Sequence, residues 1–181
     1  RQAPVLFIPQ TFDQPFCQHL IDLYHTNGGK ESGFMQAVGN QVTEVVDHQI
    51  KRRRDLVLTD SALLRSVNNL IWRRVKPEIE KAFQFTITCF ERYVVACYDA
   101  SHQGHFKPHR DNTMPGTSHR RFAMTLNLNT EAYQGGELRF PEYGSSLYRP
   151  ETGEAIIFSC SLLHEATPVA QGQRFALLTF F

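Results

Sequence analysis

The chain has 181 residues, enough for one sizeable hydrophobic core and short for two, so a single domain over residues 1–181 is expected. The formal net charge of +1 gives no overall field that could hold a nucleic acid. No apolar run reaches the length of a membrane span, and no signal-peptide pattern opens the chain. A cytoplasmic protein without a nucleic-acid or membrane partner is therefore expected. The sequence gives no indication of oligomeric state.

Residues 1–85 are expected to form helical support with one early strand, and residues 86–181 the β core. Because the sequence opens at Arg1 without a methionine, a domain cut from a longer chain is one hypothesis. The four cysteines form no C-x-x-C pair and are interpreted as buried free thiols of a reducing cytosol.

Two helical segments are predicted in the first half of the chain. Asp13 offers a cap and Pro15 a first-turn proline, and the helical spacing that follows ends at Asn27-Gly28-Gly29. A second segment begins near residues 59–61, and Pro77 is expected to kink it or to divide it in two.

The second half has short alternating runs rich in β-branched and aromatic residues, separated by turn residues. Gly135-Gly136 is expected to serve a turn that needs positive φ and a close approach of two strands. Many short strands, with helices collected at one end of the sequence, predict a mainly β sandwich or barrel with helices against one face. Strands are predicted near residues 42–48, 86–98, 121–129, 137–140, 146–149, 154–159, 164–169 and 173–180.

Three residues suggest a metal site. His109 and Asp111 form a His-x-Asp step, and in extended backbone residues i and i+2 point to the same side. This step alone is weak evidence for a metal site. His164, however, follows the apolar run 155–158 and could lie at the same end of the sandwich as His109 and Asp111. Two imidazoles and one carboxylate on one face form the facial triad of non-haem iron(II) oxygenases, although zinc could also accept these ligands.

Arg174 lies ten residues after His164, inside an apolar run. A guanidinium can bind a carboxylate through two parallel hydrogen bonds, which suits the far end of a dicarboxylate whose other end chelates the metal. A surface ion pair is the alternative for any single arginine. The apolar neighbours of Arg174 favour a buried cation that needs an anion.

The ordered motifs over residues 86–181 resemble the prolyl 4-hydroxylase-like branch of the 2-oxoglutarate/Fe(II)-dependent oxygenases. The resemblance rests on the segments Tyr93–Tyr98, Gly104–Asn112, Arg121–Asn129, Gly135–Phe140 and His164–Arg174. It implies a double-stranded β-helix, or jelly-roll, buttressed by the helices. It also implies that His109, Asp111 and His164 bind Fe(II), and that Arg174 binds the 5-carboxylate of 2-oxoglutarate. Dioxygen would be the other cosubstrate, and ascorbate an accessory reductant.

Three further residues are expected near the cosubstrate. The resemblance places the Tyr98 hydroxyl on bound 2-oxoglutarate, and a ring packed in the core is the competing interpretation. Thr125 and Asn127 share the strand face opposite to the apolar Met124, so they are expected beside the carboxylate that Arg174 holds. Some relatives have tyrosine at the place of Asn127.

The reaction implied by the resemblance is hydroxylation of an unactivated C–H bond, with a prolyl residue of a peptide or protein as first hypothesis. A free amino acid or other small molecule is an alternative substrate. Asp111 favours hydroxylation because related halogenases carry a small residue in its place. Two rival hypotheses stay open, a metal-dependent dioxygenase or hydrolase that never uses 2-oxoglutarate and a non-catalytic jelly-roll recognition module.

The basic run Lys51-Arg52-Arg53-Arg54 also has two interpretations. Most charge runs are solvated surface. The alternative, suggested by the resemblance, is a substrate-facing loop at the mouth of the barrel.

Overall fold

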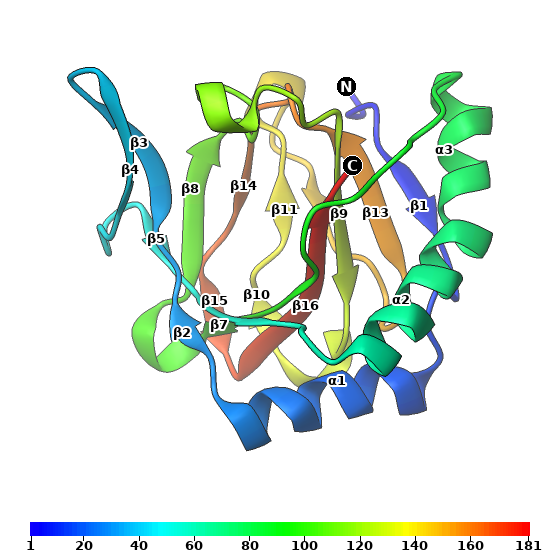
Figure 1. The fold of residues 1–181 in the computed structure, drawn as a ribbon. Helices are drawn as coiled ribbons and strands as arrows, with labels where there is room; N and C mark the ends of the chain where they lie inside the picture. The colour runs from blue at the N-terminus through cyan, green and yellow to red at the C-terminus, as the bar shows by residue number, and fades with distance from the viewer.

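Two facing antiparallel sheets form the body of the molecule, which the computed structural model describes over residues 1–181 (Figure 1). The larger sheet has the strand order β1 (Leu6–Ile8), β13 (Ala155–Ser159), β9 (Phe122–Asn127), β16 (Gln173–Phe180), β7 (Val94–Asp99), β6 (Arg54–Val57) and β2 (Lys30–Glu31). The smaller has the order β12 (Leu147–Tyr148), β11 (Leu138–Arg139), β14 (His164–Ala166), β8 (His105–His109) and β5 (Lys51–Arg52). Two further pairs join β10 (Gln134–Gly135) to β15 (Val169–Gln171) and β3 (Phe34–Val38) to β4 (Gln41–Val45). The predicted jelly-roll is confirmed.

The helices begin and end where the local sequence indicates. Asp13 caps α1 (Gln14–Asn27) by accepting a backbone N–H of the first turn, and the helix ends at the predicted Asn-Gly-Gly stop. Pro77 lies in the first turn of α3 (Lys76–Phe83), directly after α2 (Ser61–Arg74), so it divides the second segment in two as predicted. No helix of the structure combines the length and apolarity needed to cross a membrane.

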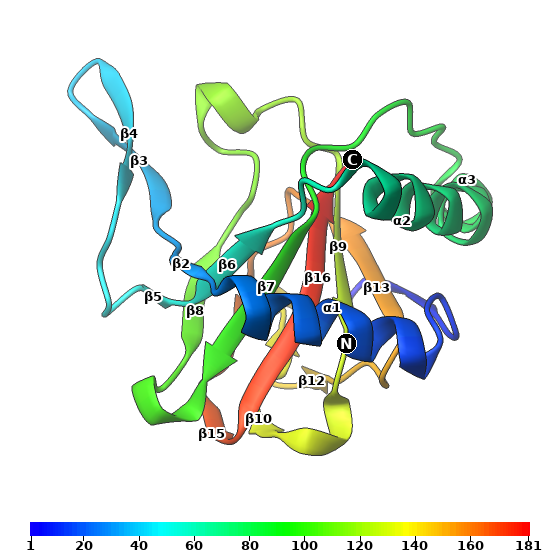
Figure 2. The same cartoon turned by 60° about the horizontal axis from the view of Figure 1, so that its bottom comes forward.

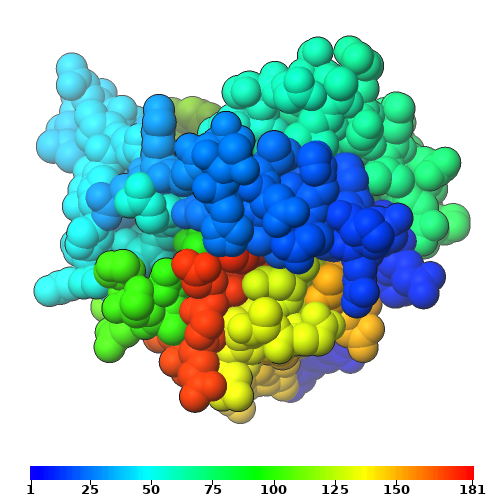
Figure 3. All heavy atoms as spheres, turned by 90° about the horizontal axis from the view of Figure 1, so that it is seen from below, coloured from blue at the N-terminus to red at the C-terminus, as the bar shows by residue number.

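The main hydrophobic core lies between the helices and the outer face of the larger sheet. Met124, Leu126 and Leu128 of the β9 region belong to this core together with buried side chains of all three helices. Helix α1 runs across these strands and covers them (Figures 2 and 3). Because side chains alternate along a strand, the other face of β9 points toward the smaller sheet, as the pattern predicts. That inner face builds the site.

The strand predicted over residues 86–98 is too long. Only Val94–Asp99 joins the sheet. The preceding residues use their aromatic rings against the helices, with Phe90 at 6.0 Å from Trp72 and at 4.5 Å from Tyr93 between ring centroids. An alternating apolar pattern therefore marks burial here without sheet pairing.

The strand predicted over residues 164–169 is two strands. β14 pairs with β8 in the smaller sheet, whereas β15 pairs with β10. Pro168 lies between them and has no N–H to offer a continuous ladder.

The strand predicted over residues 42–48 ends at Val45, and His48 lies in the turn that follows. Its partner β3 was not predicted, and together they form a hairpin that projects from the body (Figure 1). The basic run is not a loop, which corrects the second of its two interpretations. Lys51 and Arg52 form β5, and Arg54 begins β6. Of the cysteines, Cys89 is exposed, which corrects its predicted burial.

Candidate metal centre and cosubstrate pocket

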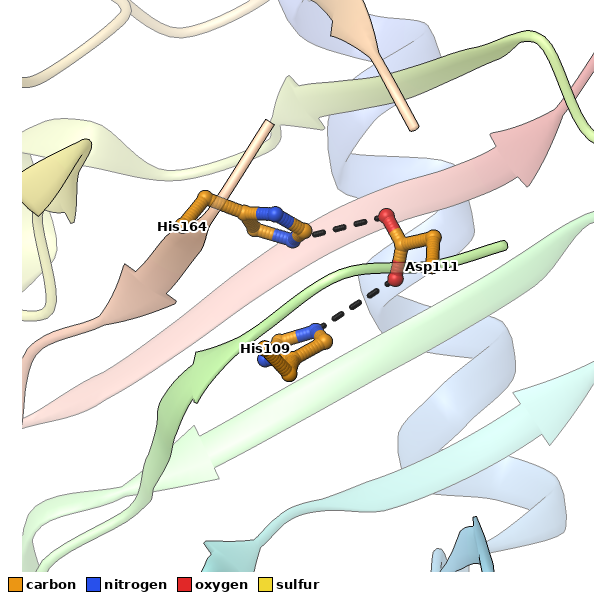
Figure 4. A group of neighbouring side chains, drawn as sticks. All are labelled: His109, Asp111 and His164. Carbon is orange, nitrogen blue, oxygen red and sulfur yellow. Dashed lines mark ion pairs between the residues drawn. The ribbon is translucent and has the colours of Figure 1, made fainter. Parts of the chain in front are cut away.

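The two sheet strands β8 and β14 bring the predicted metal ligands together. His109 ends β8, Asp111 follows two residues later, and His164 begins β14 directly opposite His109 in the ladder. The two carboxylate oxygens of Asp111 each lie 3.4 Å from an Nε2 atom, one of His109 and one of His164 (Figure 4). All three ligand atoms lie within 4.8 Å of one another. One ion could contact all three.

Backbone carbonyls set the tautomer of both imidazoles. Nδ1 of His109 lies 2.7 Å from the carbonyl oxygen of Lys107, and Nδ1 of His164 lies 3.1 Å from that of Leu162. Because a carbonyl can only accept, each Nδ1 carries the proton and each Nε2 presents its lone pair toward Asp111. This is the arrangement of a metal-binding histidine pair.

Burial sets the charge state of the cluster. Burial raises the pKa of the Asp111 carboxyl, but the adjacent His164 and His109 outweigh this and hold that pKa below its ordinary value. Burial also lowers the pKa of His164 to about 4. The cluster therefore combines a neutral distal imidazole with a carboxylate at neutral pH, and these are the forms that bind a metal. Two nitrogens and one carboxylate oxygen on one side fit Fe(II) with open positions for other ligands.

Arg174 lies on β16 of the larger sheet and is only 2% exposed. Its Nη2 donates to Oδ1 of Asn127 at 3.3 Å, but its buried Nε and Nη1 have no hydrogen-bond partner. A buried guanidinium without a carboxylate is costly, so the site is built to receive an anion. This fits a dicarboxylate that reaches from Arg174 toward the metal cluster.

A cavity of about 550 Å³ connects these groups. Its wall includes six of the seven residues singled out from the sequence, namely Tyr98, His109, Asp111, Thr125, His164 and Arg174. Asn127 lies behind Arg174 and donates to the Tyr133 hydroxyl at 2.9 Å and to the Pro150 carbonyl at 2.9 Å. It can therefore act on a ligand through Arg174.

Tyr98 packs in the core and also lies on the cavity wall, and its contact with 2-oxoglutarate stays a prediction. The side chain is 4% exposed and its ring lies 5.1 Å from the Arg174 guanidinium carbon. Its hydroxyl accepts from Nη1 of Arg53 at 3.5 Å, on the cavity wall. Tyr98 is thus a packed core ring that also presents a polar atom to the cavity.

Sequence reasoning missed one aromatic residue of the site, Phe106, and named Lys51 only as part of the basic run. Phe106 stacks on His109 with 3.5 Å between ring centroids, and the Lys51 ammonium lies 4.7 Å from the centre of the Phe106 ring. Phe106 and His109 are three residues apart, which regular alternation would place on opposite faces, and the register shift between β8 and β14 at this point could not be predicted from the sequence. His105 begins β8 and contacts the carbonyl oxygen of Gln49.

Comparisons with known proteins agree with this geometry. Residues 93–181 match the family model of the 2OG-Fe(II) oxygenase superfamily. A PKHD-type hydroxylase of Shewanella sp. (strain MR-7) is 32% identical over 151 residues, which is 76% of this chain and 63% of that protein. The chain spans less than two thirds of the length of the first curated relatives that it matches.

Two solved structures share the fold. The viral collagen prolyl hydroxylase of Paramecium Bursaria Chlorella virus-1, in its 2OG complex, has a TM-score of 0.71 at 16% identity and covers 98% of this chain and 95% of its own. The prolyl hydroxylase of Trichoplax adhaerens, in complex with a hypoxia inducible factor peptide fragment, has a TM-score of 0.72 at 18% identity, with 98% and 82% covered. Residues 93–181 thus form a domain of the 2-oxoglutarate/Fe(II) oxygenase superfamily, and the chain shares its fold with these two prolyl hydroxylases.

Proposed function

We propose that this protein is a 2-oxoglutarate- and Fe(II)-dependent dioxygenase that hydroxylates an unactivated C–H bond. The observation that carries the proposal is the buried Arg174, whose Nε and Nη1 lack partners, in one cavity with a cluster of two histidines and an aspartate. A mononuclear zinc hydrolase has no use for such an arginine, whereas a dicarboxylate cosubstrate requires one.

The residues divide the work as follows. His109, Asp111 and His164 would hold Fe(II), and Arg174 would hold the distal carboxylate of 2-oxoglutarate. When bound, the iron and 2-oxoglutarate supply oxidative decarboxylation, which delivers one oxygen atom of dioxygen to the substrate and leaves succinate and carbon dioxide. The Nδ1 contacts of both histidines fix the ring orientations, and the buried walls exclude water from the reacting atoms.

A prolyl residue in a peptide or protein is the first substrate in this proposal. Support comes from the prolyl hydroxylase names of the structural neighbours and from the cavity wall, to which the projecting hairpin contributes Phe34, Met35 and Gln36. A wall made partly by a projecting element leaves room for an extended chain. Ascorbate is proposed as the accessory reductant that keeps the iron ferrous.

Anaerobic reconstitution and turnover test the proposal. Fe(II) and 2-oxoglutarate together should produce a visible charge-transfer absorption, and admission of air should release succinate, with more released when proline-containing peptides are present. The absorption should be absent in Asp111→Ala. A protein that shows neither the absorption nor succinate would be a recognition module or a hydrolase, and the proposal would fail.

A further inference from the structure

The basic run points its side chains to two sides of β5. Lys51 lines the large cavity, Arg52 and Arg54 line a separate, smaller pocket, and Arg53 contributes to the walls of both. This follows from the alternation of side chains along extended backbone. Half of the run therefore faces the proposed active site, and Lys51 is 5% exposed there.

The Lys51 ammonium has no carboxylate partner. It donates to the Ser32 hydroxyl at 2.8 Å and to the Gly33 carbonyl at 2.6 Å, and it lies 4.7 Å from the centre of the Phe106 ring. The neighbouring Glu44 accepts instead from the backbone N–H of Gly33 at 3.1 Å. Burial, followed by the charge of Arg53, lowers the pKa of Lys51 to about 6, and a carboxylate bound beside it would raise this pKa again and favour the ammonium form.

The other cations on the cavity wall are paired with acids. Arg53 is paired with Asp55, Arg110 with Glu142, and both Arg92 and Arg120 with Glu91. Lys51 and Arg174 are the two cations of the wall without an acid, and both are more than nine-tenths buried. The proposed cosubstrate supplies an anion to Arg174 and leaves Lys51 free for a second one.

The position of Lys51 relates it to the metal cluster. The Phe106 ring lies against the Lys51 ammonium and is also stacked on the imidazole of His109 at 3.5 Å. An anion at Lys51 would thus lie beside the metal cluster, and a bond a few atoms along the same molecule could face the metal. Resting on the proposed function, we propose that Lys51 binds a carboxylate of the substrate and selects anionic substrates over neutral ones.

Binding of matched carboxylate and amide probes tests this inference without turnover. Protein loaded with Mn(II) and N-oxalylglycine is titrated by calorimetry with three sets of pairs. The first set consists of capped peptides that contain one proline. The members of each pair differ only by aspartate against asparagine, placed either directly before or directly after the proline. The second is the dipeptide Gly-Pro with a free or amidated C-terminus, and the third is proline against prolinamide. The sets distinguish a side-chain, a C-terminal and a free amino-acid carboxylate.

At least one carboxylate probe should bind about tenfold or more tightly than its amide, because a charge-assisted bond to a buried cation is lost in the amide. Lys51→Gln, whose amide can still donate to Gly33, and Lys51→Met should both abolish this preference. Lys51→Arg should keep it. Arg52→Gln is the matched control, since it removes the adjacent cation on the other side of the strand, and it should bind as the unaltered protein does.

The inference is overturned if no carboxylate probe binds better than its amide, or if the preference survives in both neutral variants of Lys51. Thermal midpoints of Lys51→Gln and Lys51→Met show whether each variant is folded. Because the two side chains differ in shape, one variant remains for the test if the other does not fold. Succinate release in air, measured separately, tests the proposed oxygenase function. A protein can fail either test alone, so the two failures are distinguishable.

Discussion

At the scale of single residues, the unpaired guanidinium of Arg174 contains the most functional information. A buried cation loses its hydration, and one hydrogen bond to Asn127 does not restore it. Natural folds tolerate such a group where a ligand completes it. The partners of Asn127, the Tyr133 hydroxyl and the Pro150 carbonyl, hold it in place, so Arg174 is fixed before any ligand arrives. A fixed cation loses less entropy on binding.

Replacement of Arg174 should separate binding from folding. In Arg174→Gln the half-saturating 2-oxoglutarate concentration should rise by about tenfold to a hundredfold, because a charge-assisted hydrogen bond contributes about 1.5–3 kcal/mol. Arg174→Lys should lose less. The thermal midpoint of Arg174→Gln without cosubstrate should not fall, since the variant removes an unpaired buried charge. Succinate release against 2-oxoglutarate concentration, and thermal unfolding, measure both effects.

Arg139→Gln is the control for this prediction, because Arg139 forms an ordinary, partly exposed pair with Glu165. It should leave the 2-oxoglutarate requirement unchanged. An unchanged requirement in Arg174→Gln as well would remove Arg174 from cosubstrate binding.

At the scale of elements, local signals were predictable and distant pairing was not. The Asp13 cap and Pro77 act within one turn of helix, so the helix boundaries could be read directly from the sequence. His109 and Asp111 were recognised because two positions in extended backbone share a side. Lys51 was named only within a basic run of two interpretations, because β5 has two residues and becomes a strand only by pairing with β8, more than fifty residues away. Such short edge strands have no periodic pattern of their own.

The turn at Gly135-Gly136 connects an element to the site. Both residues have positive φ, as predicted, and a Cβ at Gly136 would lie 2.9 Å from Val169 Cγ2 and 3.2 Å from Arg174 Cδ. Gly136→Ala should therefore destabilise the fold by about 1–3 kcal/mol, and it should also raise the 2-oxoglutarate requirement by displacing Arg174. Denaturant unfolding and cosubstrate titration measure the two effects.

Gly116→Ala is the matched control for the turn variant, since nothing lies within 4 Å of a Cβ added at Gly116. It should leave both quantities unchanged. A Gly136→Ala protein as stable as the unaltered one, with an unchanged 2-oxoglutarate requirement, would show that the close approach to Arg174 has no consequence.

At the scale of the whole molecule, the site joins the two sheets. The metal cluster comes from β8, β14 and the residues that follow β8, all on the smaller sheet, whereas Arg174 comes from the larger one. The two sheets of the jelly-roll therefore meet at the cavity. A ligand that contacts both groups links the sheets across their open side.

This arrangement predicts that metal and cosubstrate stabilise the fold together. A ligand at about one hundred times its dissociation constant adds about 2.7 kcal/mol, which corresponds to a rise in thermal midpoint of about 5–10 °C for a domain of this size. Mn(II) with 2-oxoglutarate should raise the midpoint by more than Mn(II) alone, and 2-oxoglutarate alone should have little effect because the metal holds its other end. Asp111→Ala should show neither the rise in thermal midpoint caused by Mn(II) nor the further rise caused by 2-oxoglutarate. Arg174→Gln should keep the rise caused by Mn(II) and lose the further rise. Equal responses of the two variants would contradict a ligand that bridges the sheets.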